Sequence, residues 1–309
     1  SIEAEHQQTR RSHGNPGTCW PVLAGVGGVW WITVGSRLAV AEHGTACWTD
    51  PDPDVRSSVV APEPAPPPLV EALYEVSFRD SPGWSELTYK RLEAAFASKF
   101  DGKRATMEAV GVQFQFGPGG KMTSGAAPRL RKRQLWTKDD GELVQFAPTM
   151  CAYNILSHYC RFELHADEIE RLYGMYLAEV QPKAVEWVGQ RYINKVVVPA
   201  KDDPAAYFSL YPKLPTVAAH RPFALQVAMA QFDGGEVAVN LAYQGSGQAD
   251  GQGDAVFFLD IYARSNGPVP AVAHDLRIWH EKAHPFVRSC FQAALTATSR
   301  ALFGVPEST

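Results

Sequence analysis

The chain has 309 residues, of which 45% are hydrophobic and 20% are charged, and its formal net charge at pH 7 is -4. This composition is typical of a soluble globular protein with one large domain or two small ones. This small net charge gives no overall attraction to nucleic acid or to an anionic membrane. Binding to either would require a local basic patch on the protein.

Cysteine usage favours a reducing compartment. The five cysteines are odd in number and never form a CxxC pair, which argues against a disulfide framework and against a zinc knuckle. We therefore predict a cytoplasmic protein without a cofactor or a membrane partner. Its cysteines are interpreted as packing residues: Cys19, Cys47, Cys151, Cys160 and Cys290.

Residues 1–65 differ in composition from the rest of the chain. An apolar, glycine-rich run at 21–35 is followed by a proline-rich stretch, which favours extended and unpaired backbone. The run is too short to span a membrane. A secretory signal peptide that ends at Ala39-Val40-Ala41 is one alternative. We predict a poorly ordered extension, which a translation start placed too early would explain.

From Pro66 onward the chain carries a regular pattern of elements. Apolar and polar residues alternate from Val70 to Phe78, as in a half-buried strand. Helical spacing follows from Ser85 to Phe100, and Asp101-Gly102 is typical of a C-terminal glycine cap. After three strand-like runs, a second helix is predicted from Ile169 to Val180. The three runs are Thr106–Phe116, Arg129–Thr137 and Glu142–Ile155.

The same order of elements begins again at Trp187. The predicted elements are strands at Val188–Val198, Phe223–Phe232, Glu236–Gln244 and Ala255–Ala263, a short helix at Asp203–Leu210, and a final helix at His274–Phe303 that is kinked at Pro285. We therefore predict an α+β fold of two β-α-β-β-β-α halves in tandem, 66–184 and 185–305, with antiparallel sheets and the long helices packed on one face. The opposite face, or the cleft between the halves, is the expected binding surface.

Four segments resemble an uncharacterised conserved family. PPLVEALYEVSF at 67–78, ELVQFAPTMCAYNILSHY at 142–159, GQRYINKVVVP at 189–199 and FVRSCFQAALTATSRALFG at 286–304 look like a family of sporadically distributed bacterial and archaeal proteins. The similarity spans about 66–304, in order, and leaves 1–65 uncovered. Because that family has no established activity, the resemblance implies a fold and transfers no catalytic residue.

One segment, His280-Glu281-Lys282-Ala283-His284, matches the H-E-x-x-H pattern of zinc metalloproteases, in which two histidines bind the metal and the glutamate polarises water. Pro285 follows directly and would distort the turn that holds both ligands. A third ligand is missing, since Glu307 is the only carboxylate or imidazole further along the chain. We therefore reject a metal site and predict an amphipathic helix with its charged residues in solvent and these residues inward: Trp279, Ala283, Val287, Cys290 and Phe291.

The densest basic cluster in the chain consists of Arg129, Arg131, Lys132 and Arg133. On a strand its three arginines share one face and are able to grip phosphates, while Trp136 on the other face is available for base stacking. We prefer the alternative, in which the arginines pair with strand carboxylates such as Glu71 and Glu75.

Two weaker groups complete the candidate binding residues. Polar residues near the start of the second helix form one possible pocket, with structural capping as the alternative: Asn154, His158, Tyr159 and Glu163. Arg191 and Asn194 lie in the most specific family-like segment but fall on opposite faces of an ideal strand, so we do not expect them to form one site.

Two functions remain open. The preferred one is a non-enzymatic binding module that uses the sheet face or the cleft between the halves for a protein, nucleic-acid or nucleotide partner. The alternative is a metal-dependent hydrolase that uses His280, Glu281 and His284. The missing third ligand and the lack of a recognisable nucleophile elbow favour the first.

Overall fold

The computed structural model describes residues 22–26, 29–33, 68–109, 112–116, 122–126, 130–156, 159, 161–212, 223–246 and 253–304. The chain divides into two compact units, Ser1–Val40 with Glu108–Arg131 and Ala41–Met107 with Lys132–Thr309. The first unit contains two antiparallel two-stranded sheets: β1 (Val22–Val26) with β2 (Val29–Thr33), and β5 (Val112–Phe116) with β6 (Met122–Ala126). Of the expected extension at 1–65, only this first hairpin lies within the described residues.

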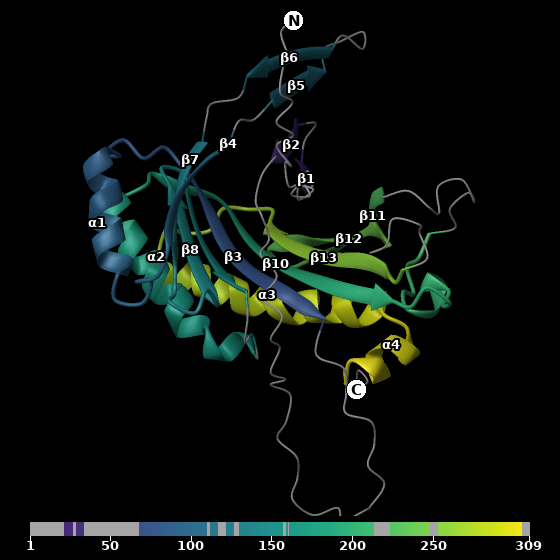
Figure 1. Cartoon of the computed structure of the whole chain (residues 1–309). Helices are drawn as coiled ribbons and strands as arrows, with labels where there is room; N and C mark the ends of the chain where they lie inside the picture. The colour runs from purple at the N-terminus through teal and green to yellow at the C-terminus, as the bar shows by residue number, and fades with distance from the viewer. Residues whose placement is uncertain are drawn as a thin grey trace, which may run out of the picture. The chain divides into compact units, whose positions relative to one another are not determined.

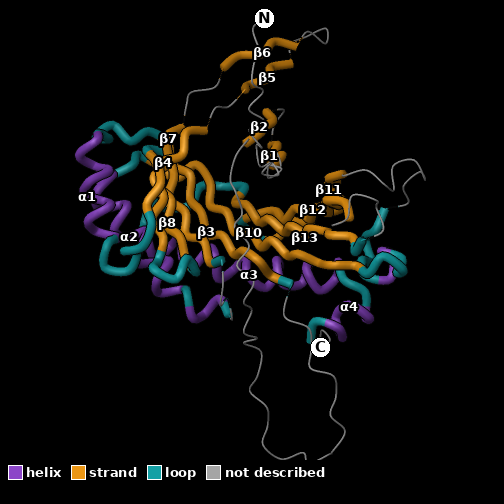
Figure 2. The backbone as a smooth tube through the Cα atoms, viewed as in Figure 1, coloured by secondary structure: helices purple, strands orange, loops and turns teal. Residues whose placement is uncertain are grey.

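The second unit is built around a nine-stranded sheet, shown in Figures 1 and 2. Across the sheet the order is β11 (Phe223–Phe232), β12 (Gly235–Ser246), β13 (Ala255–Ser265), β10 (Ala184–Val198), β3 (Leu69–Arg79), β9 (Met150–Ile155), β8 (Glu142–Ala147), β7 (Leu130–Trp136) and β4 (Arg104–Ala109). The pairings with a described register are antiparallel. The chain is therefore an α+β protein with one large antiparallel sheet.

Apart from β4 at the outer edge, the strand order is symmetric about the pair formed by β10 and β3. From β3 outward the neighbours are β9, β8 and β7, and from β10 outward they are β13, β12 and β11. In each series the strand that comes first in the sequence, β3 or β10, lies at the centre of the sheet. The strand that comes last in that series, β9 or β13, lies next to it. The two series meet along a long antiparallel pairing that runs from Ala184 opposite Arg79 to Asn194 opposite Leu69.

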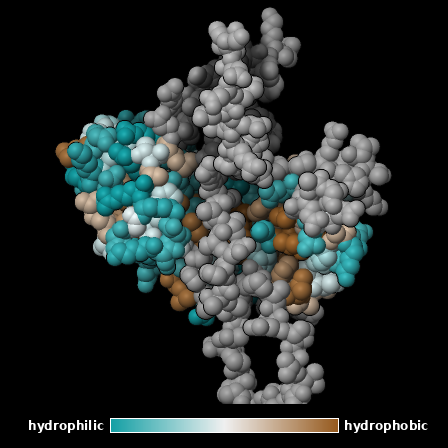
Figure 3. Space-filling model, in the orientation of Figure 1, coloured by the Kyte–Doolittle hydropathy of each residue, from teal (hydrophilic) through white to brown (hydrophobic). Residues whose placement is uncertain are grey.

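Two long helices lie below this sheet in Figure 1. They are α2 (Ala166–Val180), which contacts β9, and α3 (Ala273–Ala294), which contacts β10, β12 and β13. The two helices also pack against each other, and α1 (Glu86–Phe96) packs against α2. Hydrophilic residues cover the outer surface around α1 in Figure 3. Each helix therefore buries an apolar stripe on the sheet and leaves a polar one outside.

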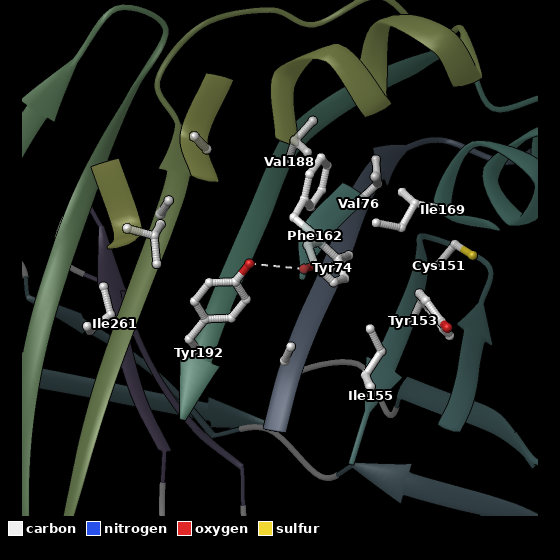
Figure 4. Close-up of a cluster of buried hydrophobic side chains, with 14 of the residues drawn as sticks. Tyr74, Val76, Cys151, Tyr153, Ile155, Phe162, Ile169, Val188, Tyr192 and Ile261 are labelled. Carbon is white, nitrogen blue, oxygen red and sulfur yellow. Dashed lines mark hydrogen bonds between the residues drawn. The ribbon is translucent and has the colours of Figure 1, made fainter. Parts of the chain in front are cut away.

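The core lies between the sheet and the helices. Alternate residues of β3 point into it, and Ala72, Tyr74 and Val76 are completely buried. Figure 4 shows Tyr74 and Tyr192 facing each other from β3 and β10. The core is rich in tyrosine, and a buried phenol needs a hydrogen-bond partner. Tyr176, for example, donates to the carbonyl of Ala147 at 2.8 Å.

Several predicted boundaries were wrong. The run Glu142–Ile155 is a hairpin, β8 and β9, that turns at Pro148-Thr149, and the run Thr106–Phe116 is divided between β4 and β5. The predicted helix at Asp203–Leu210 is reduced to the 3-10 turn η2 (Pro204–Ala206), which Asp203 caps. The turn between β8 and β9 lies within an apolar stretch that periodicity alone treats as continuous.

The ends of two helices also differ from the prediction. Helix α1 ends at Phe96, and Gly102 does not cap it: a Cβ on Gly102 would lie 2.4 Å from the carbonyl oxygen of Thr137, so glycine permits a close backbone approach there. The final helix continues through Pro285 and ends at Ala294, and α4 (Ala297–Leu302) follows with Thr296 as its N-cap. Both corrections come from tertiary contacts that local sequence does not show.

Candidate functional site

The face of the sheet opposite α2 and α3 carries a row of polar side chains that bond from strand to strand; we call it the helix-free face, because no described helix packs on it. Gln134 on β7 donates to Gln145 on β8 at 2.9 Å, and Gln145 donates to Asn154 on β9 at 2.8 Å. Asn154 in turn donates to Glu71 on β3. A buried amide such as Asn154, only 2% exposed, is held in one orientation by these bonds.

Arg191 continues this row into the second series of strands. Its guanidinium donates two hydrogen bonds of 2.7 Å to the carboxylate of Asp260 on β13, a bidentate pair. The side chains of Arg191 and Asp260 are only 18% and 17% exposed. Burial alone would lower the pKa of Arg191, but the charges of Asp260, Glu75 and Glu71 outweigh it and raise the pKa. Arg191 is therefore a fixed cation at the centre of the sheet.

Glu75 forms a second centre on the helix-free face. It accepts a hydrogen bond from Tyr262 and lies near Arg191, Lys132 and Arg264. Burial raises the pKa of Glu75, and the same burial raises the pKa of Glu71, although hydrogen bonding by Asn154 and the charge of Arg191 oppose it there. Arg264 lies over the ring of Trp187 at 4.7 Å.

The charges of the helix-free face balance. Its central acids are Glu71, Glu75 and Asp260, and its central bases are Lys132, Arg191 and Arg264. Burial lowers the pKa of Lys132, and the charge of Glu75 opposes this effect.

The structure brings together two of the residues that the sequence singled out. Both residues interact with Glu71. Asn154 donates a hydrogen bond to its carboxylate, and the positive charge of Arg191 lies close enough to lower its pKa. Asn194 lies on the other face of β10 and donates to the carbonyl of Leu259 at 3.1 Å, so Arg191 and Asn194 do not share a site. Asn194 therefore has a structural role.

The basic cluster divides between the two faces of β7. Arg133 points toward α1, where it pairs with Glu86 at 2.9 Å and Glu93 at 3.4 Å. The preferred expectation of ion pairing was therefore right in kind and wrong in partner, because Glu71 and Glu75 lie on the opposite face of the sheet. Arg131 on the same strand is exposed. Trp136 lies under Lys103 at 4.9 Å, and Arg129 is outside the described residues.

The expected pocket at 154–163 does not form as one group. Asn154 lies on the helix-free face, whereas Tyr159 points toward the helices and His158 is outside the described residues. The Tyr159 hydroxyl is 2.6 Å from that of Tyr192. The Tyr192 hydroxyl is a hub, with Tyr74 at 3.0 Å, Gln190 at 2.9 Å and His284 Nδ1 at 2.9 Å as further partners.

The helix that carries the H-E-x-x-H segment is amphipathic as predicted, with Trp279, Ala283 and Val287 buried and Lys282 exposed, and the two histidines of the segment also pack inward. His280 is completely buried, and its Nε2 lies 3.0 Å from the Tyr173 hydroxyl. Burial lowers the pKa of His280 to about 3, so its ring is neutral at pH 7. Glu281 bonds to Arg277 one turn earlier. Within the described part of the chain, no group of three His, Cys, Asp or Glu residues is placed to hold a metal ion.

A surface groove of about 580 Å³ runs beside His284, between α3 and the start of α2. Burial lowers the pKa of His284, with Glu163 opposing the effect and Arg288 adding to it. Sequence analysis named Glu163 and His284 in separate groups and did not predict this groove, because its walls come from segments more than a hundred residues apart. Its lining residues are Phe162, Glu163, Ala166, Asp167, Arg277, Glu281, His284, Pro285 and Arg288.

Sequence analysis missed Asp260 and Tyr262 as members of the site, and it named Glu71 only as an expected partner of the basic cluster. A possible sign was available for Tyr262, because Gly189 interrupts a β-branched strand, and a glycine there often marks a close approach by another group.

No family model matches the chain, and no curated protein matches it. No helix in the described ranges is long and apolar enough to cross a membrane.

Proposed function

We propose that this protein is a non-enzymatic binding module whose contact surface is the helix-free face, and that its partner is a polypeptide. The observation that supports this proposal most directly is the set of polar side chains on this face. A hydrogen-bonded row runs from Gln134 to Glu71, and the Arg191–Asp260 pair lies next to it, with Arg191 close in charge to Glu71. Side chains that already hold one another in place lose little entropy when a partner binds, which favours affinity.

The charge of this face supports a polypeptide over a nucleic acid. Glu71, Glu75 and Asp260 would repel phosphates at the centre of the sheet, and Arg191 is already bound to Asp260 in a bidentate pair. Arg133 of the basic cluster already forms ion pairs with the carboxylates of Glu86 and Glu93 on α1. A peptide with both acidic and basic side chains matches a balanced face.

We further infer that the fold arose by duplication of a β-α-β-β-β-α half and that the chain belongs with the uncharacterised family that 66–304 resembles. The symmetric strand order about β10 and β3 supports the duplication. The cytoplasmic location expected from cysteine usage stays a prediction. The hydrolase alternative has no supporting observation, since His280, Glu281 and His284 each bond to a neighbouring side chain.

A photo-cross-linking experiment tests the proposed surface. Benzoylphenylalanine at Lys195, on the helix-free side of β10, should give one dominant cross-linked protein in the native host. The matched control is the same probe at Lys282 on α3, which should give none of that product. A product of equal intensity at Lys282, or cross-linking only to nucleic acid at Lys195, would overturn the proposal.

A second experiment separates the two macromolecule classes. Fluorescence anisotropy with a labelled single-stranded RNA and a labelled DNA duplex should show no binding that weakens with added salt. Salt-dependent binding that Arg264→Ala abolishes would assign the face to nucleic acid instead.

A further inference from the structure

Strand β11 forms one edge of the nine-stranded sheet. It pairs with β12 on one side, from Phe223 opposite Tyr243 to Phe232 opposite Gly235. No strand of the described residues pairs with its other side. Along that side the backbone N–H and C=O groups of a strand are available to another strand.

The sequence of β11, FALQVAMAQF, lacks the charges and prolines that normally protect an edge, although a register irregularity between Gln226 and Ala228 interrupts its pairing with β12. It contains no charged residue and no proline over its 10 residues, and Met229 in its second half is 60% exposed. The opposite edge differs, because β4 carries Arg104 and Glu108 within 6 residues. Charges and prolines at an edge discourage pairing with another chain, so only the β11 edge is suited to it.

We propose that β11 pairs antiparallel with β11 of a second copy of this chain, so that the two sheets become one. A twofold pairing brings the same short segment of both copies together, so a charged strand would place like charges near each other. An uncharged strand avoids this repulsion, and its two glutamines, Gln226 and Gln231, are able to bond across the pair. These properties fit a second copy better than a charged partner peptide.

The pairing would extend the helix-free face across both copies. Met229 lies opposite Ala238 in β12, on the helix-free side of the sheet, so this side chain and its counterpart would flank the twofold axis. The inference does not depend on the proposed function, because the edge and the face are different surfaces. Edge pairing alone buries little area, so we expect a dimer that dissociates on dilution.

Sedimentation velocity on the full chain over a wide range of concentration tests this inference. The expected result is a concentration-dependent species with twice the 33.9 kDa mass of one chain. Met229→Lys and Met229→Glu should each weaken dimerisation by roughly tenfold or more, since like charges then approach each other. An equimolar mixture of the two variants should recover the dimer. Leu87→Lys on α1, where the native side chain is 58% exposed, is the matched control and should dimerise as the native chain does.

Two proline variants test the backbone pairing without reliance on side chains. Adjacent N–H groups in a strand point to opposite sides, so one of Met229→Pro and Ala230→Pro removes a bond to β12 and the other removes a donor from the free edge. One variant should therefore keep the native stability and be monomeric. A native chain that is monomeric at every concentration, or a dimer that survives in the stable proline variant and in Met229→Lys, would overturn the inference.

Discussion

Gly189 on β10 and Tyr262 on β13 are diagonal neighbours: a Cβ on Gly189 would lie 2.7 Å from the Tyr262 hydroxyl. The missing side chain lets this phenol cross the strand and donate to Glu75 on β3. A glycine within a strand is normally unfavourable because it packs nothing, so its position here is explained by the close approach of Tyr262.

Gly189→Ala should displace Tyr262 from Glu75 and lower the free energy of unfolding by about 1 to 2 kcal/mol, because a buried carboxylate loses a hydrogen bond. Denaturant unfolding measures the change. Gly83→Ala, at a glycine with nothing within 4 Å of the added Cβ, is the control and should change stability little. If the Tyr262 bond carries the effect, Tyr262→Phe and Gly189→Ala should be strongly non-additive; simple additivity would contradict this explanation.

Asp260→Ala should destabilise the protein by about 2 to 3 kcal/mol, because it leaves the half-buried guanidinium of Arg191 without its bidentate partner. A surface ion pair provides the comparison. Lys138 and Asp101 lie 2.7 Å apart with 79% and 43% of their side chains exposed, so Asp101→Ala should cost less than about 1 kcal/mol. Thermal or denaturant unfolding of both variants measures the two losses of stability. Equal losses would contradict the partly buried, bidentate pairing of Asp260 with Arg191.

The sequence predicted the large elements of the second unit better than it predicted their neighbours across the sheet. Alternation located β3, β10, β11, β12 and β13 to within a few residues, because each strand has one buried face. It joined β8 to β9, since the turn between them is only two residues long. Sequence analysis also named Arg191 and Asn154 as candidates but did not predict that both interact with Glu71. The pairing of distant strands is set by the whole fold and leaves no local pattern in the sequence.

His280 should make stability depend on pH. Its folded pKa is about 3 and its unfolded value is near 6.5, so the neutral ring stabilises the folded state fully above pH 6.5. Below that pH the unfolded chain binds a proton that the folded chain does not, and stability falls by about 1.4 kcal/mol per pH unit toward the folded pKa.

Comparison with His280→Leu isolates this contribution from that of the carboxylates. The free energy of unfolding of the native chain should fall more steeply than that of the variant as the pH decreases below 6.5. Parallel curves for the native chain and His280→Leu would mean that His280 titrates in the folded protein as it does in the unfolded chain.

Arg133→Ala should destabilise the protein rather than change its binding. The guanidinium joins β7 to α1 through Glu86 and Glu93 and lies over the ring of Tyr89 at 5.3 Å, so its removal loosens the helix from the sheet. We expect a loss of about 1 to 2 kcal/mol, more than an exposed ion pair contributes, because the Arg133 side chain is only 21% exposed. Lys90→Ala, at an exposed position of α1, should leave the stability unchanged.

Hydrogen exchange would show the mechanism, since α1 amides should exchange faster in Arg133→Ala while those of α3 stay unchanged. If instead stability is native and affinity for a nucleic acid falls, Arg133 is a phosphate ligand and the structural role given to it here is wrong.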